Sequence, residues 1–159
     1  MGQWNREEID QAFKHMLMVI DRYPEEGNWN SWVDLLTEDA EYYDDVFEPR
    51  KGREVIREWL NGISLNYPQS EMKHFPCPWY IVDEERGWVV CEFLNTMVDP
   101  GDGQLYQQKN YSRYKYAGNN SWSEAEDQYN PAALQKLQKA WMAAKGDNEG
   151  NKTIFDQSE

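Results

Sequence analysis

The motif EDAEYYDD, which contains Asp44, carries the residue types best suited to acid–base chemistry. If residues 40–46 form a strand, the alternation of side chains places Ala40, Tyr42 and Asp44 on one face. A carboxylate that is desolvated among apolar neighbours has a raised pKa and becomes a competent base near neutral pH. We therefore predict Asp44 as a catalytic base. The alternative interpretation is a carboxylate at the end of a loop that pairs with a nearby arginine.

A second row of polar side chains follows the strand predicted over residues 105–117. Alternate positions on one face of it hold Asn110, Ser112 and Tyr114. Hydroxyl and amide groups in such a row can donate hydrogen bonds to negative charge that develops on a substrate. We predict that Tyr42 and Asn110 hold the developing oxyanion or the leaving group, and that Ser112 and Tyr114 line the substrate site. The alternative is that the tyrosines only fill the core.

The remaining clusters of chemically active residues give weaker signals. Four carboxylates could in principle collect a cation: Glu92, Glu124, Glu126 and Asp127. No histidine spacing accompanies them, and acidic residues on strands usually form a solvated face. The sequence also contains no glycine-rich phosphate loop and no GxSxG nucleophile motif. We therefore expect neither a metal nor another cofactor.

The pattern along the chain predicts helices first and strands afterwards. Apolar residues at helical spacing predict three early helices, over 5–23, 28–37 and 53–62. Aromatic and β-branched runs predict strands over 72–83, 88–98, 105–117 and 121–129, before a last helix over 131–145. Short turns between these strands favour antiparallel pairing, and the whole order is typical of an α+β fold. We expect one domain over residues 1–145 and a polar tail without fixed structure over residues 146–159.

The composition limits the kinds of binding partner that we expect. A formal net charge of −13 repels a phosphate backbone, so we expect no nucleic acid partner. The sequence has no apolar run of the roughly 18 residues that a membrane span needs, and its start lacks an apolar signal region, so we expect a cytoplasmic protein without a membrane partner. Eight Trp and ten Tyr suit a cavity for a ring-containing ligand, but they suit a core or a dimer interface equally well.

Three local motifs, EDAEYYDD, GREVIREWL and EDQYNP, together with the order of elements, resemble the nuclear transport factor 2-like (NTF2-like) superfamily. The resemblance covers about residues 5–145 and points to the SnoaL-like and ketosteroid-isomerase-like branches. It implies a cone-shaped fold in which N-terminal helices pack on a strongly curved antiparallel sheet and enclose a pocket. It also implies a homodimer that covers the outer face of the sheet.

The resemblance also implies roles for individual residues. The ketosteroid-isomerase-like branch carries its proton-moving aspartate on the strand where Asp44 stands, and the position of its oxyanion-binding acid is held here by Ser112. The tyrosine expected on the first helix is replaced by the region of Leu17 and Met18. These departures argue against strict steroid isomerisation.

A second branch of the same superfamily, similar to scytalone dehydratase, performs eliminations. In that branch an aspartate at the end of the first helix orients a histidine at the start of the first long strand. Asp21 and His74 match in type and place, and a carboxylate in that role fixes the imidazole tautomer and stabilises its charged form. The resemblance therefore implies the Asp21–His74 pair as an alternative base. The competing interpretation is that Asp21 caps a turn and His74 lies in water.

Together these features predict a cofactor-independent lyase or isomerase, such as a dehydratase or cyclase, that acts on an apolar, ring-containing, polyketide-like or steroid-like small molecule. Its base is Asp44 or the Asp21–His74 pair. The alternative is a non-catalytic module of the same fold that binds small molecules or serves assembly. A third possibility, an epoxide hydrolase, needs an Asp–Arg–Asp set around a water molecule, but Arg113 is expected on the wrong face of its strand.

Overall fold

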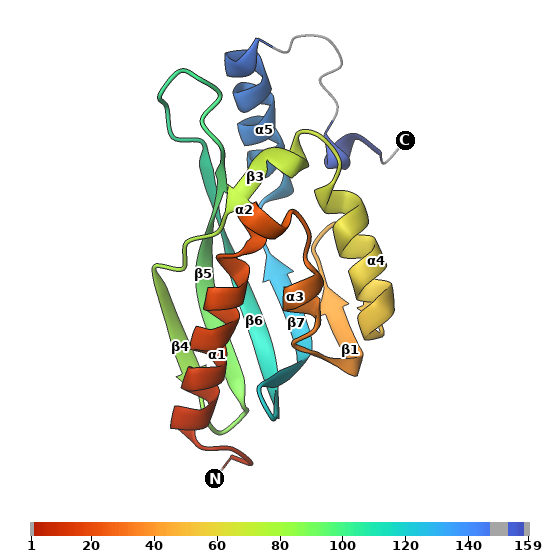
Figure 1. Cartoon of the computed structure of the whole chain (residues 1–159), viewed down its shortest axis with the longest axis vertical. Coiled ribbons are helices and arrows are strands. Elements are labelled where there is room, and N and C mark those ends of the chain that lie inside the picture. The colour runs from red at the N-terminus through yellow and green to blue at the C-terminus, as the bar shows by residue number, and fades with distance from the viewer. Residues whose placement is uncertain (1, 147–152, 158–159) are drawn as a thin grey trace.

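The computed structural model describes residues 2–146 and 153–157 (Figure 1). Its helices are α1 (Arg6–Ile20), α2 (Tyr23–Glu26), α3 (Asn30–Val33), α4 (Arg53–Ser64) and α5 (Pro131–Lys145), with 3-10 turns η1 (Gln69–Glu71) and η2 (Ile154–Gln157). Its strands are β1 (Leu36–Tyr43), β2 (Arg50–Lys51), β3 (Met72–His74), β4 (Trp79–Asp83), β5 (Trp88–Met97), β6 (Gln107–Gly118) and β7 (Ser121–Gln128). This is the α+β class expected from the sequence.

The described strands form one mixed sheet in the order β2-β1-β7-β6-β5-β3, and β4 also pairs with β5. All of these pairs are antiparallel except β1 with β7, which is parallel. The prediction of an entirely antiparallel sheet is therefore wrong at this pair. Strands β4 to β7 follow one another through short connections, which favour antiparallel neighbours, whereas β1 comes from a distant part of the chain and no hairpin fixes its direction.

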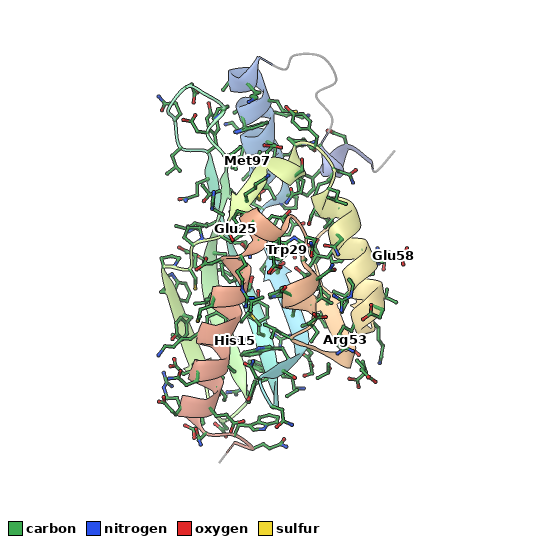
Figure 2. All side chains as sticks on the ribbon, in the orientation of Figure 1. His15, Glu25, Trp29, Arg53, Glu58 and Met97 are labelled. Carbon is green, nitrogen blue, oxygen red and sulfur yellow. The ribbon has the colours of Figure 1, made fainter. Side chains whose placement is uncertain are left out.

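Helix α1 covers one face of this sheet (Figure 1). The Asn5 side chain caps its start by accepting a hydrogen bond from the Glu8 N–H at 2.8 Å. Its buried residues recur at helical spacing and include Phe13, whose ring lies 4.8 Å from that of Tyr80 on β4. His15, also on α1 (Figure 2), has its Nδ1 2.7 Å from the Asn120 amide and holds the β6–β7 turn.

Several element boundaries differ from those predicted. The predicted helix over 28–37 shrinks to the single turn α3, because β1 already begins at Leu36. Strand β1 then ends at Tyr43, so Asp44 lies just beyond it. The long strand predicted over 72–83 is divided into β3 and β4, because Pro76 and Pro78 have no N–H to donate to a neighbouring strand.

Residues 153–157 belong to the segment predicted as an unstructured tail. Thr153 and Ile154 are buried, and the Asp156 carboxylate accepts hydrogen bonds from the Gln135 side chain and the Thr153 N–H, both at 2.7 Å. The expectation of no fixed structure does not hold for these five residues. Residues 147–152 and 158–159 lie outside the described part of the chain. None of the described helices is long and apolar enough to cross a membrane.

Candidate active site

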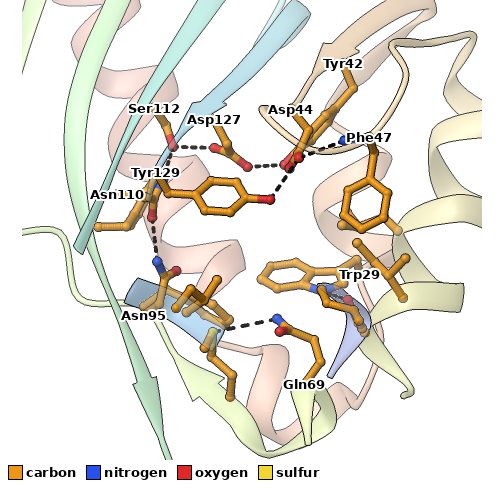
Figure 3. Close-up of a pocket in the computed structure, with 18 of the residues that line it drawn as sticks. Trp29, Tyr42, Asp44, Phe47, Gln69, Asn95, Asn110, Ser112, Asp127 and Tyr129 are labelled. Carbon is orange, nitrogen blue, oxygen red and sulfur yellow. Dashed lines mark hydrogen bonds between the residues drawn. The ribbon is translucent and has the colours of Figure 1, made fainter. Parts of the chain in front are cut away.

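A pocket with a volume of about 150 Å³ lies between the helices and the inner face of the sheet (Figure 3). Its apolar wall is mainly aromatic and includes Trp29, Trp32, Phe47, Trp59, Phe75 and Tyr114. Its polar residues include Asp44, Gln69, Asn95, Asn110, Ser112 and Asp127. Figure 3 shows Asp44, Asp127 and Tyr129 together on one side, across the cavity from Trp29 and Gln69. The pocket therefore offers a substrate one side that carries carboxylates and another that is mainly aromatic.

Asp127, near the end of β7, is the central polar group of this wall. The Ser112 hydroxyl donates to Asp127 Oδ1 at 2.5 Å, and the Tyr42 hydroxyl donates to Oδ2. The carboxylate keeps some accessible surface, as a pocket-lining group does, but it is surrounded by protein. Burial raises the pKa of Asp127 to about 6, although the two hydrogen bonds favour the charged form. A group with this pKa exchanges protons readily near neutral pH.

A chain of amides and a hydroxyl holds Asp127 in place. The Asn95 amide donates to Asn110 Oδ1 at 2.9 Å, the Asn110 amide donates to Ser112 Oγ at 2.9 Å, and Ser112 donates to the carboxylate. The register of β6 and β7 brings Ser112 opposite Asp127. The donors of Asn110 and Tyr42, which we expected to contact substrate, are thus engaged with protein acceptors and orient Asp127.

Asp44 is the second carboxylate of the pocket. Its Oδ1 accepts hydrogen bonds from the N–H groups of Val46 at 2.8 Å and Phe47 at 3.3 Å, and from the Tyr129 hydroxyl at 2.9 Å. Burial raises the pKa of Asp44, and these three hydrogen bonds partly offset the effect. The Tyr129 N–H donates to Asp45 at 2.9 Å and so joins the two segments that carry Asp44 and Asp127.

The remaining predicted substrate contact, Tyr114, also lies at the pocket. It is buried on the inner face of β6, and desolvation raises its pKa well above the ordinary value, so its hydroxyl stays protonated. Arg113, one position earlier, faces outward as expected and binds Glu126 at 2.8 Å and Glu124 at 3.3 Å. The Asp–Arg–Asp arrangement of an epoxide hydrolase is therefore not formed around Arg113.

Asp21 and His74 lie elsewhere, in an outer groove that we define by Leu17, Asp21, Lys73, His74 and Cys77. Both side chains are exposed. No hydrogen bond or ion pair joins them, although both belong to the described part of the chain. Ile20 and Phe75 line the groove on one side and the pocket on the other. The structure therefore brings Asp44 together with the predicted polar row, but it leaves the Asp21–His74 pair on a separate surface.

The inward position of Asp127 could not be predicted from strand alternation, because β7 contains a bulge. Trp122 is buried, so plain alternation would turn Glu124 and Glu126 inward and Asp127 outward. The register shifts at this point: Tyr116 pairs with Trp122 whereas Lys115 pairs with Glu124, which leaves Ser123 as an extra residue. Beyond this bulge, the positions of β7 that alternation would turn outward face inward, so Asp127 faces the pocket. The small residue Ala125, two positions before Asp127, is the one sequence signal of that reversal.

Comparison with known proteins shows the fold. No family model matches the chain, and no curated protein matches it. An NTF2-like protein from Anabaena variabilis is 16% identical, with 82% of this chain and 95% of that chain covered and a TM-score of 0.61. A putative isomerase from Bacillus subtilis is 16% identical, with 81% and 94% covered and a TM-score of 0.63.

A steroid delta-isomerase from Pseudomonas aeruginosa is 15% identical, with 91% of this chain and 97% of that chain covered and a TM-score of 0.58. These likenesses confirm the NTF2-like, ketosteroid-isomerase-like fold that the local motifs indicated. At such identities they show the fold alone, and the same fold hosts many activities.

Proposed function

We propose that this chain, which has the NTF2-like fold, is a cofactor-independent lyase or isomerase that moves a proton on a small, apolar, ring-containing molecule. Asp127 carries the proton, and Asp44 is the second carboxylate of the site. The observation that carries the proposal is a hydrogen-bonded carboxylate with a pKa of about 6 that faces an aromatic pocket. Two carboxylates held in different environments are a common basis for acid–base catalysis.

The size of the pocket limits the substrate. A volume of about 150 Å³ is below the roughly 300 Å³ at which typical ligand sites begin. A cavity of about that size in another protein accommodates benzene. We therefore infer a substrate with one ring rather than a fused polycyclic system.

Deuterium exchange tests the proposal before the natural substrate is identified. Cyclohexanone has acidic C–H groups beside its carbonyl and one ring. We expect the protein to accelerate uptake of deuterium from D2O at these carbons, measured by mass spectrometry, above the rate in buffer. The double variant Asp44→Asn/Asp127→Asn should return the rate to that of buffer. Acceleration that survives in the double variant would exclude this site as the source.

The alternative, a binding module without catalysis, is favoured by one observation. The pocket is small and its walls carry many rings, such as the stacked Tyr23 and Trp29 at 4.1 Å between centroids. A module of this kind would bind cyclohexanone and show no exchange above the buffer rate. Binding measured by calorimetry alongside the exchange assay separates the two functions.

We further propose a homodimer through the outer face of the sheet. Trp79 and Ile81 on β4 and Tyr111 on β6 are 42%, 59% and 41% exposed. The neighbouring Arg113–Glu126 pair gives the face both signs of charge, which suits contact with a second copy. Light scattering should give a dimer for the wild type and a monomer for Ile81→Glu. A monomeric wild type at micromolar concentration would overturn this assignment.

A further inference from the structure

The charge of the pocket is uncompensated. None of the described residues that line it is Lys, Arg or His, whereas two are aspartates. The Arg50 guanidinium lies over the Trp59 ring, 5.4 Å from its centroid, and donates to the Glu48 carbonyl at 2.7 Å, and Arg53 donates to the Leu36 carbonyl at 3.3 Å. Among the described residues, neither guanidinium forms a hydrogen bond or an ion pair with a pocket aspartate. Buried charges in proteins are normally paired. With no cation among these lining residues, the pocket aspartates are neutralised either by protonation or by a positively charged ligand.

Asp44 has an oxygen available for such a ligand. All three of its hydrogen bonds from described residues end on Oδ1. Its Oδ2 accepts none of the hydrogen bonds found among those residues. On Asp127, by contrast, Ser112 occupies one oxygen and Tyr42 the other. The two carboxylates thus differ: one is held by protein donors on both oxygens, and the other keeps an oxygen for an incoming donor.

Three aromatic rings line the same pocket as Asp44. The Trp59 ring lies 5.1 Å from that of Tyr42 and 5.6 Å from that of Phe47, both centroid to centroid. Tyr42 and Phe47 flank Asp44 in the chain, and all three rings line the pocket. Ring faces attract cations, and the attraction strengthens where water is excluded. A carboxylate beside such rings is an arrangement suited to an alkylammonium group.

We infer that the pocket takes small cyclic amines in their protonated form, with the ammonium group on Asp44 Oδ2 among the rings of Tyr42, Phe47 and Trp59. The inference rests on the proposed function and names the substrate class for the same site. Asp44 binds the charge, and Asp127, oriented by Ser112 and Tyr42, moves the proton. A neutral ring of equal size would fill the same volume but leave Asp44 without a partner.

Calorimetry with two matched ligands tests the inference. Cyclohexylammonium and cyclohexanol have the same ring and differ in charge. We expect cyclohexylammonium to bind at least about tenfold more tightly at pH 7.5, which is the scale of a desolvated cation–aromatic contact. Asp44→Asn should abolish the difference. Glu48→Gln, which removes a nearby exposed carboxylate, should leave it intact. Retained cyclohexanol binding shows that each variant is folded.

The affinity for the amine should also depend on pH. The ionisable groups that line this pocket are Asp44, Asp127, Tyr23, Tyr42, Tyr114 and Tyr129. The exposed Asp45 and the Arg50 guanidinium over Trp59 lie beside it. Burial raises the pKa of both pocket aspartates, so protonation at low pH removes negative charge from the pocket. We expect cyclohexylammonium binding to weaken as the pH falls from 7.5 to 5, whereas cyclohexanol binding should stay constant.

The outcomes separate the two proposals. Exchange of cyclohexanone without preference for cyclohexylammonium would overturn the amine inference and leave the proposed function standing. Preference for cyclohexylammonium without exchange would support the amine site and count against catalysis. Equal affinity for the two ring ligands, or equal losses in Asp44→Asn and Glu48→Gln, would overturn the inference.

Discussion

The pocket and the outer groove carry the same kinds of acid–base residues in different surroundings. In the pocket, Asp44 and Asp127 are held by hydrogen bonds, and burial raises the pKa of each. In the groove, Asp21 and His74 are exposed, and no hydrogen bond or ion pair between them is found in the described part of the chain. The groups that can do chemistry are therefore distinguished by burial and fixed partners rather than by residue type.

The pocket and the outer groove share two lining residues. Ile20, at the end of α1, and Phe75, just after β3, contribute to both cavities. A substrate in the pocket therefore meets Asp127 directly but is divided from His74 by these side chains.

The largest effect should come from Asp127→Asn. Loss of a positioned general base lowers a rate by roughly 10²- to 10⁴-fold, so we expect cyclohexanone exchange to fall at least about 100-fold. Glu126→Gln is the matched control, because Glu126 is adjacent on β7 but faces outward to Arg113. Equal rates for Asp127→Asn and wild type would remove Asp127 from the mechanism.

The next effect concerns stability. The pKa of Asp127 rises from 3.8 to about 6 on folding, so the folded protein binds the proton more tightly than the unfolded chain. Its contribution to the free energy of unfolding therefore falls as the pH rises from about 4 to about 6, by about 3 kcal/mol in total. Asp127→Asn should lose this dependence and be more stable than wild type at pH 7.5. Urea unfolding at several pH values measures the free energy of unfolding of both proteins. The same pH dependence in wild type and Asp127→Asn would contradict the raised pKa of Asp127.

A smaller effect is expected for Tyr129→Phe. The substitution removes the hydroxyl that donates to Asp44 at 2.9 Å, so the pKa of Asp44 should rise further. Cyclohexylammonium binding should weaken by up to roughly tenfold, the scale of one hydrogen bond to a charged group, and the loss should be greater at the lower of two pH values than at the higher. Tyr43→Phe, which removes a hydroxyl that donates to Glu41 outside the pocket, is the control. Equal weakening at both pH values would mean that Tyr129 acts only through packing.

The smallest effect should follow substitution of the groove residues. Asp21→Asn and His74→Gln should each leave cyclohexanone exchange within about twofold of wild type, because neither side chain lines the pocket. A loss of tenfold or more in either variant would reverse the comparison. The Asp21–His74 pair would then be the working base, as in the elimination branch that the sequence resembles.

Much of the fold could be predicted from the sequence, because helical spacing and strand alternation are local signals. Helix α1, helix α4 and strands β5 to β7 occur close to their expected positions. Alternation also placed Tyr42, Asn110 and Ser112 on the inner face, where they are buried. These predictions share one cause: alternation along a single strand sets the face on which each of its side chains lies.

The parts that could not be predicted depend on contacts between distant segments. The parallel pairing of β1 with β7 is set by packing, and the bulge at Ser123 turns Asp127 inward. The inner partners of Asp127, Ser112 and Tyr42, come from two other strands. The raised pKa of Asp127 results from these contacts between strands. The acidic residues beside Asp127 in the sequence do not indicate it.

A carbon-13 NMR titration of the aspartate carboxyl groups tests the central claim most directly. Asp127→Asn identifies the resonance by its loss, and no substrate is required. The account predicts a midpoint near pH 6 for Asp127, which burial in the aromatic pocket produces. A midpoint near pH 4 would show an ordinary solvated carboxylate, and it would contradict the assignment of Asp127 as the proton carrier.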